Sequence, residues 1–144
     1  MNENRDLVEA IFTGAPFIRS LGIELIQFGR GWCETRLSIK PTHQQQHGSV
    51  HAGVLMTVTD HTCGGAAASV VPEDKDVITV ENKVSFLRPA LGAALSCRAQ
   101  VLRAGRNLIF VEAEVLVEGK EDRKIVAKAS STLAVIPRNR AVQR

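Results

Sequence analysis

One segment of this chain has the pattern of a long helix, and only segments with the pattern of strands follow it. The helical segment runs from Val50 to Val70 with apolar residues at helical spacing, and Pro72 ends it. A short amphipathic helix is expected earlier, over residues 4–13, where apolar side chains recur every three or four positions. The pattern therefore predicts a sheet packed against one main helix.

Strand patterns account for most of the remaining chain. Alternating apolar and polar residues, or runs of β-branched residues, are separated by turns that contain glycine, proline or asparagine. The expected strands are 23–28, 32–39, 77–87, 94–102, 108–117 and 124–136. We expect one α+β domain over residues 1–144, with a core of residues 15–136 in which an antiparallel sheet of about six strands wraps around the long helix. Residues 137–144 form a basic tail that is expected to fray.

Composition limits the class of protein. A chain of 144 residues with 44% hydrophobic and 23% charged residues is typical of one globular domain. No segment approaches the roughly 20 apolar residues of a membrane span, and residues 1–6 lack the apolar run of a signal peptide, so we expect a cytoplasmic protein without a membrane partner. The net charge of +3 allows an anionic ligand, but scattered basic residues and 4% aromatic content argue against nucleic acid.

Cysteine and histidine residues could in principle hold a metal, but their spacing argues against it. Cys33, Cys63 and Cys97 are far apart and odd in number, so we interpret them as reduced packing residues. Four histidines lie between His43 and His61, yet Gly48 and Ser49 interrupt them and no HExxH pattern or acidic cluster is present. We therefore expect no metal and no cofactor.

A glycine-bearing turn leads into the long helix near Ala52, and the same helix carries Asp60. The first turn of a helix has unbonded backbone N–H groups and the positive end of the dipole, so it can stabilise a developing oxyanion. Asp60 is eight residues later, about 12 Å along the axis, whereas a reacting carbonyl must lie about 3 Å from both groups. Two antiparallel helices across a twofold axis would bring them together, which predicts a dimer. The alternative for Asp60 is a solvated helix carboxylate.

Four groups of residues carry a resemblance to a known family. They are the pair His47-Gly48, the sequence His51-Ala52-Gly53, Asp60 nine residues after His51, and Phe86-Leu87-Arg88-Pro89. Together with the order of elements, they make residues 15–136 resemble the hotdog-fold acyl-coenzyme A thioesterases of the phenylacetate-degradation (PaaI-like) type. The resemblance implies a hotdog fold, a homodimer that assembles into a tetramer, and hydrolysis of acyl-coenzyme A to free acid and coenzyme A.

The resemblance also assigns roles to residues of the candidate site. It makes the backbone N–H of Ala52, between His51 and Gly53, the oxyanion donor, although the family usually has glycine at this position. It makes Asp60 the nucleophile or the general base. Gln45 stands where many relatives have asparagine, and its amide would bind the thioester carbonyl or the attacking water. The hydroxyl of Thr79 would orient water or the carboxylate.

Cations are expected near the phosphates of coenzyme A, and the candidates are Arg88, Arg103 and Arg106, with His47 also near the substrate. The alternative for each arginine is a solvated surface position. Two other functions stay open: a non-catalytic acyl-coenzyme A binding module, and a hotdog hydratase or dehydratase. The sequence does not choose between aryl-acetyl and short to medium aliphatic acyl groups.

Overall fold

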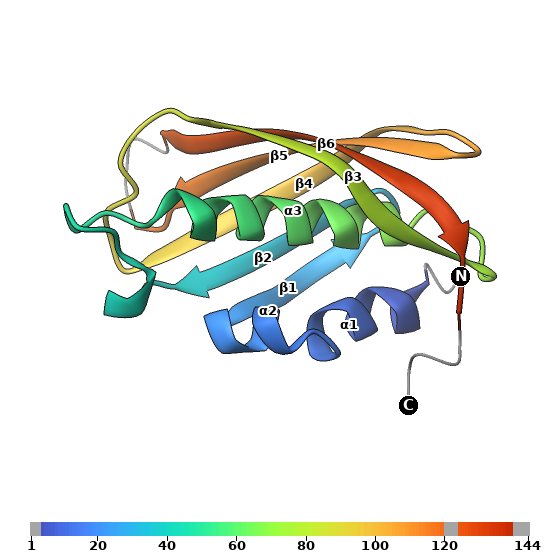
Figure 1. The fold of residues 1–144 in the computed structure, drawn as a ribbon, viewed down its shortest axis with the longest axis horizontal. Helices are drawn as coiled ribbons and strands as arrows, with labels where there is room; N and C mark the ends of the chain where they lie inside the picture. Colours follow the sequence, from blue (N-terminus) through green and yellow to red (C-terminus); the bar gives the residue numbers. More distant parts are fainter. Residues whose placement is uncertain (1–3, 120–123, 140–144) are drawn as a thin grey trace.

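The computed structural model describes residues 4–119 and 124–139, so residues 140–144 of the expected tail lie outside the described residues. Figure 1 shows a sheet that curves over one long helix, with two short helices on the other side of that helix. In chain order the elements are α1 (Arg5–Thr13), α2 (Pro16–Leu21), β1 (Ile23–Gly29), β2 (Trp32–Ser38), a 3₁₀ turn (Pro41–His43), α3 (Ala52–Ala68), β3 (Lys75–Phe86), β4 (Ala94–Ala104), β5 (Leu108–Val117) and β6 (Ile125–Pro137).

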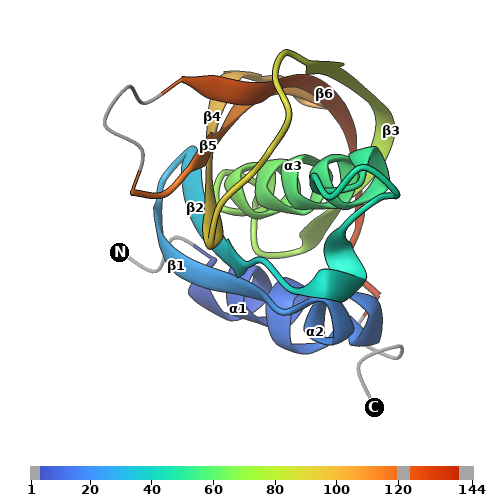
Figure 2. The same cartoon turned by 90° about the vertical axis from the view of Figure 1, so that its left-hand side faces the viewer.

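The six strands form one antiparallel sheet in the order β1-β2-β4-β5-β6-β3. Seen end-on in Figure 2, this sheet curls around α3, which runs along its concave face. The expected α+β arrangement, an antiparallel sheet wrapped around one long helix, is confirmed. Strands β1 and β3 stand at the two edges, and β3 carries a bulge between Thr79 and Glu81.

Helix α3 is buried on most of its circumference, which explains its apolar composition. It spans Ala52–Ala68, two residues shorter at each end than the expected helix. A Cβ atom on Gly65 would lie 2.7 Å from Cys33 Sγ and 3.1 Å from the Phe12 ring, so glycine permits the close approach of β2 and α1. At Gly64 the same atom would meet nothing, so this close packing concerns Gly65 and not Gly64.

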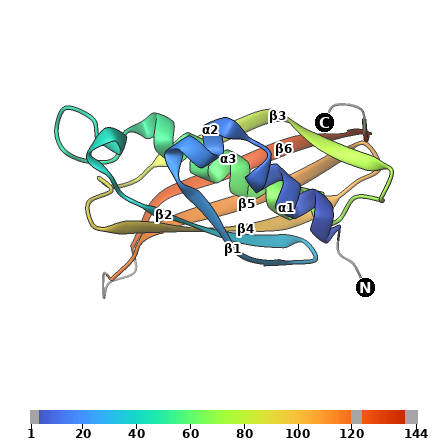
Figure 3. The same cartoon turned by 90° about the horizontal axis from the view of Figure 1, so that it is seen from below.

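The N-terminal region contains two helices instead of one. The expected short helix is α1, which buries Leu7, Val8 and Phe12. Gly14 caps the C-terminal end of α1, and Pro16 occupies the first turn of α2, where its missing N–H costs nothing. Gly22, with a φ of 86°, ends α2 in the left-handed conformation. Figure 3 shows α1 and α2 lying across α3 and β1.

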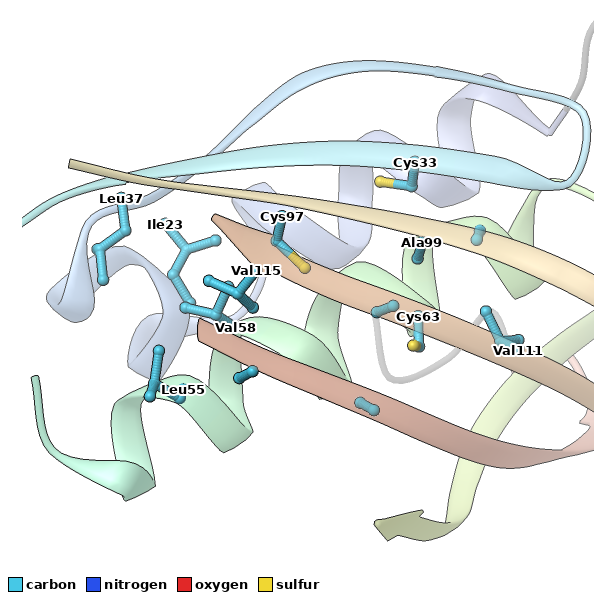
Figure 4. Packing of buried hydrophobic residues seen from close by; sticks show 14 of the residues in the cluster. Ile23, Cys33, Leu37, Leu55, Val58, Cys63, Cys97, Ala99, Val111 and Val115 are labelled. Carbon is cyan, nitrogen blue, oxygen red and sulfur yellow. The ribbon is translucent and has the colours of Figure 1, made fainter. Parts of the chain in front are cut away.

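The core fills the space between α3 and the sheet, as Figure 4 shows for Leu55 and Val58 facing Val115. Burial of each such side chain stabilises the fold by about 1.5–3 kcal/mol. The three cysteines belong to this core and are unpaired, which confirms their interpretation as packing residues. Burial raises the pKa of Cys33 and of Cys97 to about 12, so both thiols stay protonated and unreactive at neutral pH.

Candidate functional site

The N-terminus of α3 presents one unbonded backbone N–H group. His51 is the N-cap, in extended conformation, and its Nδ1 accepts a hydrogen bond of 2.8 Å from the Gly53 N–H. Within the described part of the chain, the Ala52 N–H donates no hydrogen bond. Among the described residues Asn4 is the only non-glycine residue with positive φ, so Ala52 is unstrained in place of glycine. A donor at a helix N-terminus is therefore open to a ligand.

A cavity of about 490 Å³ lies beside this N–H group. Residues between 45 and 55 form one wall, and residues 86–90, at the end of β3 and after it, form the other. A hydrogen bond from the Val50 N–H to the Ala90 carbonyl, at 3.0 Å, joins the two walls, and a bridge from Gln44 to Val50 closes the loop of the first wall. The structure thus brings Gln45, His51, Ala52 and Arg88 to one cavity.

Gln45 is fixed by its own loop. Its backbone N–H donates to the Ser49 carbonyl at 2.8 Å, and its side-chain Oε1 accepts a hydrogen bond from the His47 N–H. Gly48, with a φ of 87°, closes this turn. The side-chain amide N–H₂ of Gln45 has no acceptor among the described residues, so this group is available to bind a carbonyl oxygen or a water molecule in the cavity.

Asp60 and Thr79 meet between α3 and β3. The Thr79 hydroxyl donates to Asp60 Oδ1 at 2.7 Å, and Oδ2 accepts no hydrogen bond from the described residues. Asp60 is half-buried on the outward face of α3. The hydrogen bond fixes one oxygen of the carboxylate and leaves the other available for chemistry. These two residues, which the sequence places on different elements, therefore form a pair in the structure.

The cavity and the Asp60 carboxylate are separate within one chain. Neither Asp60 nor Thr79 lines the cavity beside Ala52. Both Ala52 and Asp60 belong to the continuous helix α3, and eight residues correspond to about 12 Å along its axis. One chain therefore supplies an oxyanion donor and a carboxylate at two different places.

The four candidates for contact with coenzyme A lie in different places. Arg88 lines the cavity, and its Nη1 donates to the Ile125 carbonyl at 2.6 Å. His47 is exposed and does not line the cavity. Arg103 lies near the end of β4, and Arg106 lies in the turn between β4 and β5. The Asn107 carbonyl in this turn accepts a hydrogen bond from the Val135 N–H of β6, which pairs with β3 near its start. The turn is therefore at the end of α3 opposite to Ala52. Within one chain, Arg88 alone of these four residues lines the cavity.

Two residues that sequence reasoning did not select also belong to this region. Phe86, at the end of β3, lines the cavity. It belongs to the motif Phe86-Leu87-Arg88-Pro89, of which only Arg88 was selected as a candidate from the sequence. Asn82 lies opposite α3, where its Nδ2 is 3.4 Å from the Met56 carbonyl oxygen and 3.5 Å from Thr59 Oγ1. Its Oδ1 is buried without a partner among the described residues. Because of the bulge in β3, the alternation of a regular strand does not predict that Asn82 faces α3.

The histidines bind backbone groups in separate places. His43 accepts from the Lys40 N–H through Nδ1 and contacts the Leu21 carbonyl through Nε2. His61 donates from Nε2 to the Ile11 carbonyl at 3.0 Å and packs edge-on against Phe12. Across residues 4–119 and 124–139, no group of three or more His, Cys, Asp and Glu side chains is arranged to hold a metal ion.

Burial of His61 predicts a pH dependence of stability. Burial lowers its pKa in the folded protein, against smaller raising effects of the Ile11 carbonyl and Asp60. The unfolded chain therefore takes up the proton first as pH falls below about 6.5, and the free energy of unfolding decreases. His61→Gln keeps an N–H donor without titrating, so we expect its melting temperature to fall less than that of the wild type between about pH 7.5 and 5.5. Equal losses in both proteins would contradict this assignment.

The chain is similar to known proteins over most of its length. The family model described as "Thioesterase superfamily" matches residues 47–123. A protein of Saccharolobus solfataricus is 33% identical over 124 residues, which are 85% of each chain. A medium/long-chain acyl-CoA thioesterase of Salmonella typhimurium is 25% identical over 83% of this chain and 85% of its own length.

Solved structures share the fold. A thioesterase family protein from Silicibacter pomeroyi superposes with a TM-score of 0.87 at 33% identity, covering 94% of this chain and 99% of its own. The PaaI protein of the Escherichia coli phenylacetic acid degradation operon has a TM-score of 0.82 at 21% identity, covering 93% and 94%. The second likeness concerns the fold alone.

Proposed function

The chain belongs to the thioesterase superfamily and is a thioester hydrolase, and from this premise we propose that it hydrolyses acyl-coenzyme A to free acid and coenzyme A. The matches confirm the family resemblance found in the sequence. The observation that carries the proposal is the unbonded Ala52 N–H beside a cavity, on the same helix as the Asp60 carboxylate. The Salmonella relative, named as an acyl-CoA thioesterase, supports the substrate class.

The proposed mechanism uses groups from two chains. The thioester carbonyl accepts a hydrogen bond from the Ala52 N–H, and the helix dipole stabilises the oxyanion that forms. Asp60 of the second chain attacks the carbonyl carbon, or it removes a proton from the attacking water. Thr79 holds one carboxylate oxygen, and the Gln45 amide binds the carbonyl or the water. The carbon–sulfur bond then breaks, and the thiolate of coenzyme A takes the proton that Asp60 removed, or one from water, and leaves as the thiol. After direct attack, a water molecule hydrolyses the mixed anhydride on Asp60 and releases the free acid.

A homodimer completes this site in the proposal. The free edge of β3 supports it, because an unpaired strand edge is ready to bind another strand. Two apolar side chains near this edge are exposed, Ile78 by 55% and Val80 by 63%, and a second copy would cover them. Antiparallel association would place α3 of each chain beside the other and give two equivalent sites. Assembly of two dimers into a tetramer belongs to the same proposal.

Arg88 lines the cavity and is our candidate for a contact with the phosphates of coenzyme A. Arg103 and Arg106, at the far end of α3, would come near the site of the partner chain, because antiparallel helices bring opposite ends together. The exposed His47 lies in the loop beside the cavity and is a further candidate for contact with the nucleotide.

A cytoplasmic location is also part of the proposal. Three buried, unpaired cysteines are typical of a reducing compartment. Among the helices that the structure describes, none has the length and apolar character needed to cross a membrane.

Release of free thiol from a panel of acyl-coenzyme A substrates tests the proposed function. The panel contains aryl-acetyl, short, medium and long aliphatic thioesters. We expect measurable turnover with at least one class, because the donor and the carboxylate suit every thioester and the acyl group affects only the fit. If every substrate raises the melting temperature and none releases thiol, the protein is a binding module. If thiol is not released but an enoyl thioester is hydrated, the protein is a hydratase.

A further inference from the structure

The outward face of α3 is made of small or polar residues with one exception. Gly53, Thr57, Asp60 and Gly64 lie along this face, together with Met56, whose exposed fraction is 43%. A Cβ atom on Gly64 would contact nothing in this chain. Met56 is therefore the one large apolar side chain that this face of α3 presents to a neighbour.

The position of Met56 follows from the proposed function, on which this inference rests. If Asp60 of each chain faces Ala52 of the other, two antiparallel helices cross midway between these residues. The midpoint of residues 52 and 60 is residue 56. We propose that Met56 lies at the twofold axis against the partner subunit's Met56, and that this pair is the wall between the two sites and limits the acyl group.

The direction of the substrate makes this wall the end of the acyl pocket. The charged nucleotide must remain near solvent, and the cavity offers it the polar side chains of Gln46, Ser49 and Arg88. The acyl chain then extends from the thioester carbon away from the nucleotide, along α3 from Ala52 toward Met56. Four residues separate them, which is about 6 Å along the helix axis. A long or bulky acyl group therefore meets the methionine pair.

The backbone under Met56 is fixed while its side chain is adaptable. The Met56 carbonyl accepts a hydrogen bond of 3.0 Å from the Thr59 hydroxyl, and Asn82 Nδ2 approaches it to 3.4 Å from β3. This attaches the turn that carries Met56 to the strand that carries Thr79. An unbranched thioether fills irregular gaps easily, so the wall is firmly placed but can adjust its shape.

Disulfide trapping of Met56→Cys tests the position at the axis. A residue at the axis is the one that can reach its own copy within the Cα separation of a disulfide. The native thiols will not compete, because burial raises the pKa of Cys33 and Cys97 to about 12 and that of Cys63 well above its usual value. With oxidised glutathione we expect cross-linked dimers of Met56→Cys.

Gly64→Cys is the matched control on the same face. Its two copies would be about 24 Å apart along antiparallel helices, so it should stay uncross-linked. Equal cross-linking of both variants, or none of Met56→Cys in a protein that elutes as a dimer, would overturn the placement of Met56.

The acyl profile of Met56→Ala tests the wall. Removing most of the side chain should raise the ratio of kcat/KM for long or aryl substrates to that for short ones by about tenfold or more. Met56→Leu, which keeps the volume, should retain the wild-type profile. If Met56→Ala is active and the ratio is unchanged, Met56 does not limit the acyl group, and the proposed function still stands. If the wild type releases no thiol from any substrate, the proposed function itself is refuted.

Discussion

Asp60→Asn protein is expected to fold like the wild type and to release thiol from acyl-coenzyme A about 10²–10⁴ times more slowly. The side chain keeps its size, and its carbonyl oxygen can still accept the hydrogen bond that the Thr79 hydroxyl gives at 2.7 Å. An amide, however, neither attacks a thioester effectively nor removes a proton from water. Thiol release and melting temperature measured on the same samples separate a chemical loss from unfolding.

The control for this substitution is Asp74→Asn, the same change at an exposed position near the start of β3. It should leave kcat/KM within a factor of about two, because surface ion pairs contribute little. Equal thiol release from Asp60→Asn and wild-type protein would remove Asp60 from the mechanism. Single-turnover hydrolysis in heavy-oxygen water then tests the two roles of Asp60: label in its carboxylate means direct attack, whereas general-base catalysis places the label in the product acid alone.

The fold was predictable from sequence because periodicity and burial agree over most of the chain. In β2 the alternation of Cys33, Thr35 and Leu37 with polar residues matches alternating burial. The long α3 was equally clear, and its bounds differ by two residues at each end. The missing element was α2, because Gly14 ends α1 and Pro16, a residue that usually interrupts a helical pattern, here begins the next helix.

The site was predictable where its residues are neighbours in sequence or part of a motif, as at His51-Ala52-Gly53. Asp60 and Thr79 were both predicted from the family resemblance. The periodicity of the strand would not have predicted every residue that faces α3. Thr79 and Asn82 are three residues apart, which in a regular strand means opposite faces. The bulge between Thr79 and Glu81 places both opposite α3, since each contacts that helix. A bulge leaves no pattern that one sequence reveals.

The cavity was also beyond sequence reasoning, because its walls are distant in the chain. Residues 45–55 and 86–90 meet only after the sheet has formed and the Val50 N–H has bonded to the Ala90 carbonyl. The path of the chain through the sheet also explains why Arg88 and Arg103 lie in different places. Arg88 and Arg103 are close in sequence, but β4 runs the length of the sheet between them and carries Arg103 to the far end.

Ala52→Pro is expected to lower kcat for thiol release by about 10²–10³-fold while leaving the fold intact, because it removes one hydrogen-bond donor from the proposed oxyanion site. Proline suits the first position of a helix, and the N–H that it removes has no partner among the described residues. The preceding residue, His51, already has a φ of −61° and a ψ of 139°, which proline requires of its neighbour. Ala52→Gly, which keeps the N–H, should remain within a few-fold of wild type. Full activity of Ala52→Pro would show that the oxyanion is bound elsewhere.

Mixing the two inactive variants tests whether each site takes its residues from two chains. When Asp60→Asn and Ala52→Pro subunits are co-expressed in equal amounts, half of the dimers contain one of each. In such a dimer one site combines the intact Ala52 N–H with the intact Asp60, and the other site has lost both. The mixture should therefore recover about a quarter of the wild-type thiol release per chain, from parents that are each nearly inactive. If Ala52 and Asp60 acted within the same chain, every site would keep one defect and mixing would recover nothing.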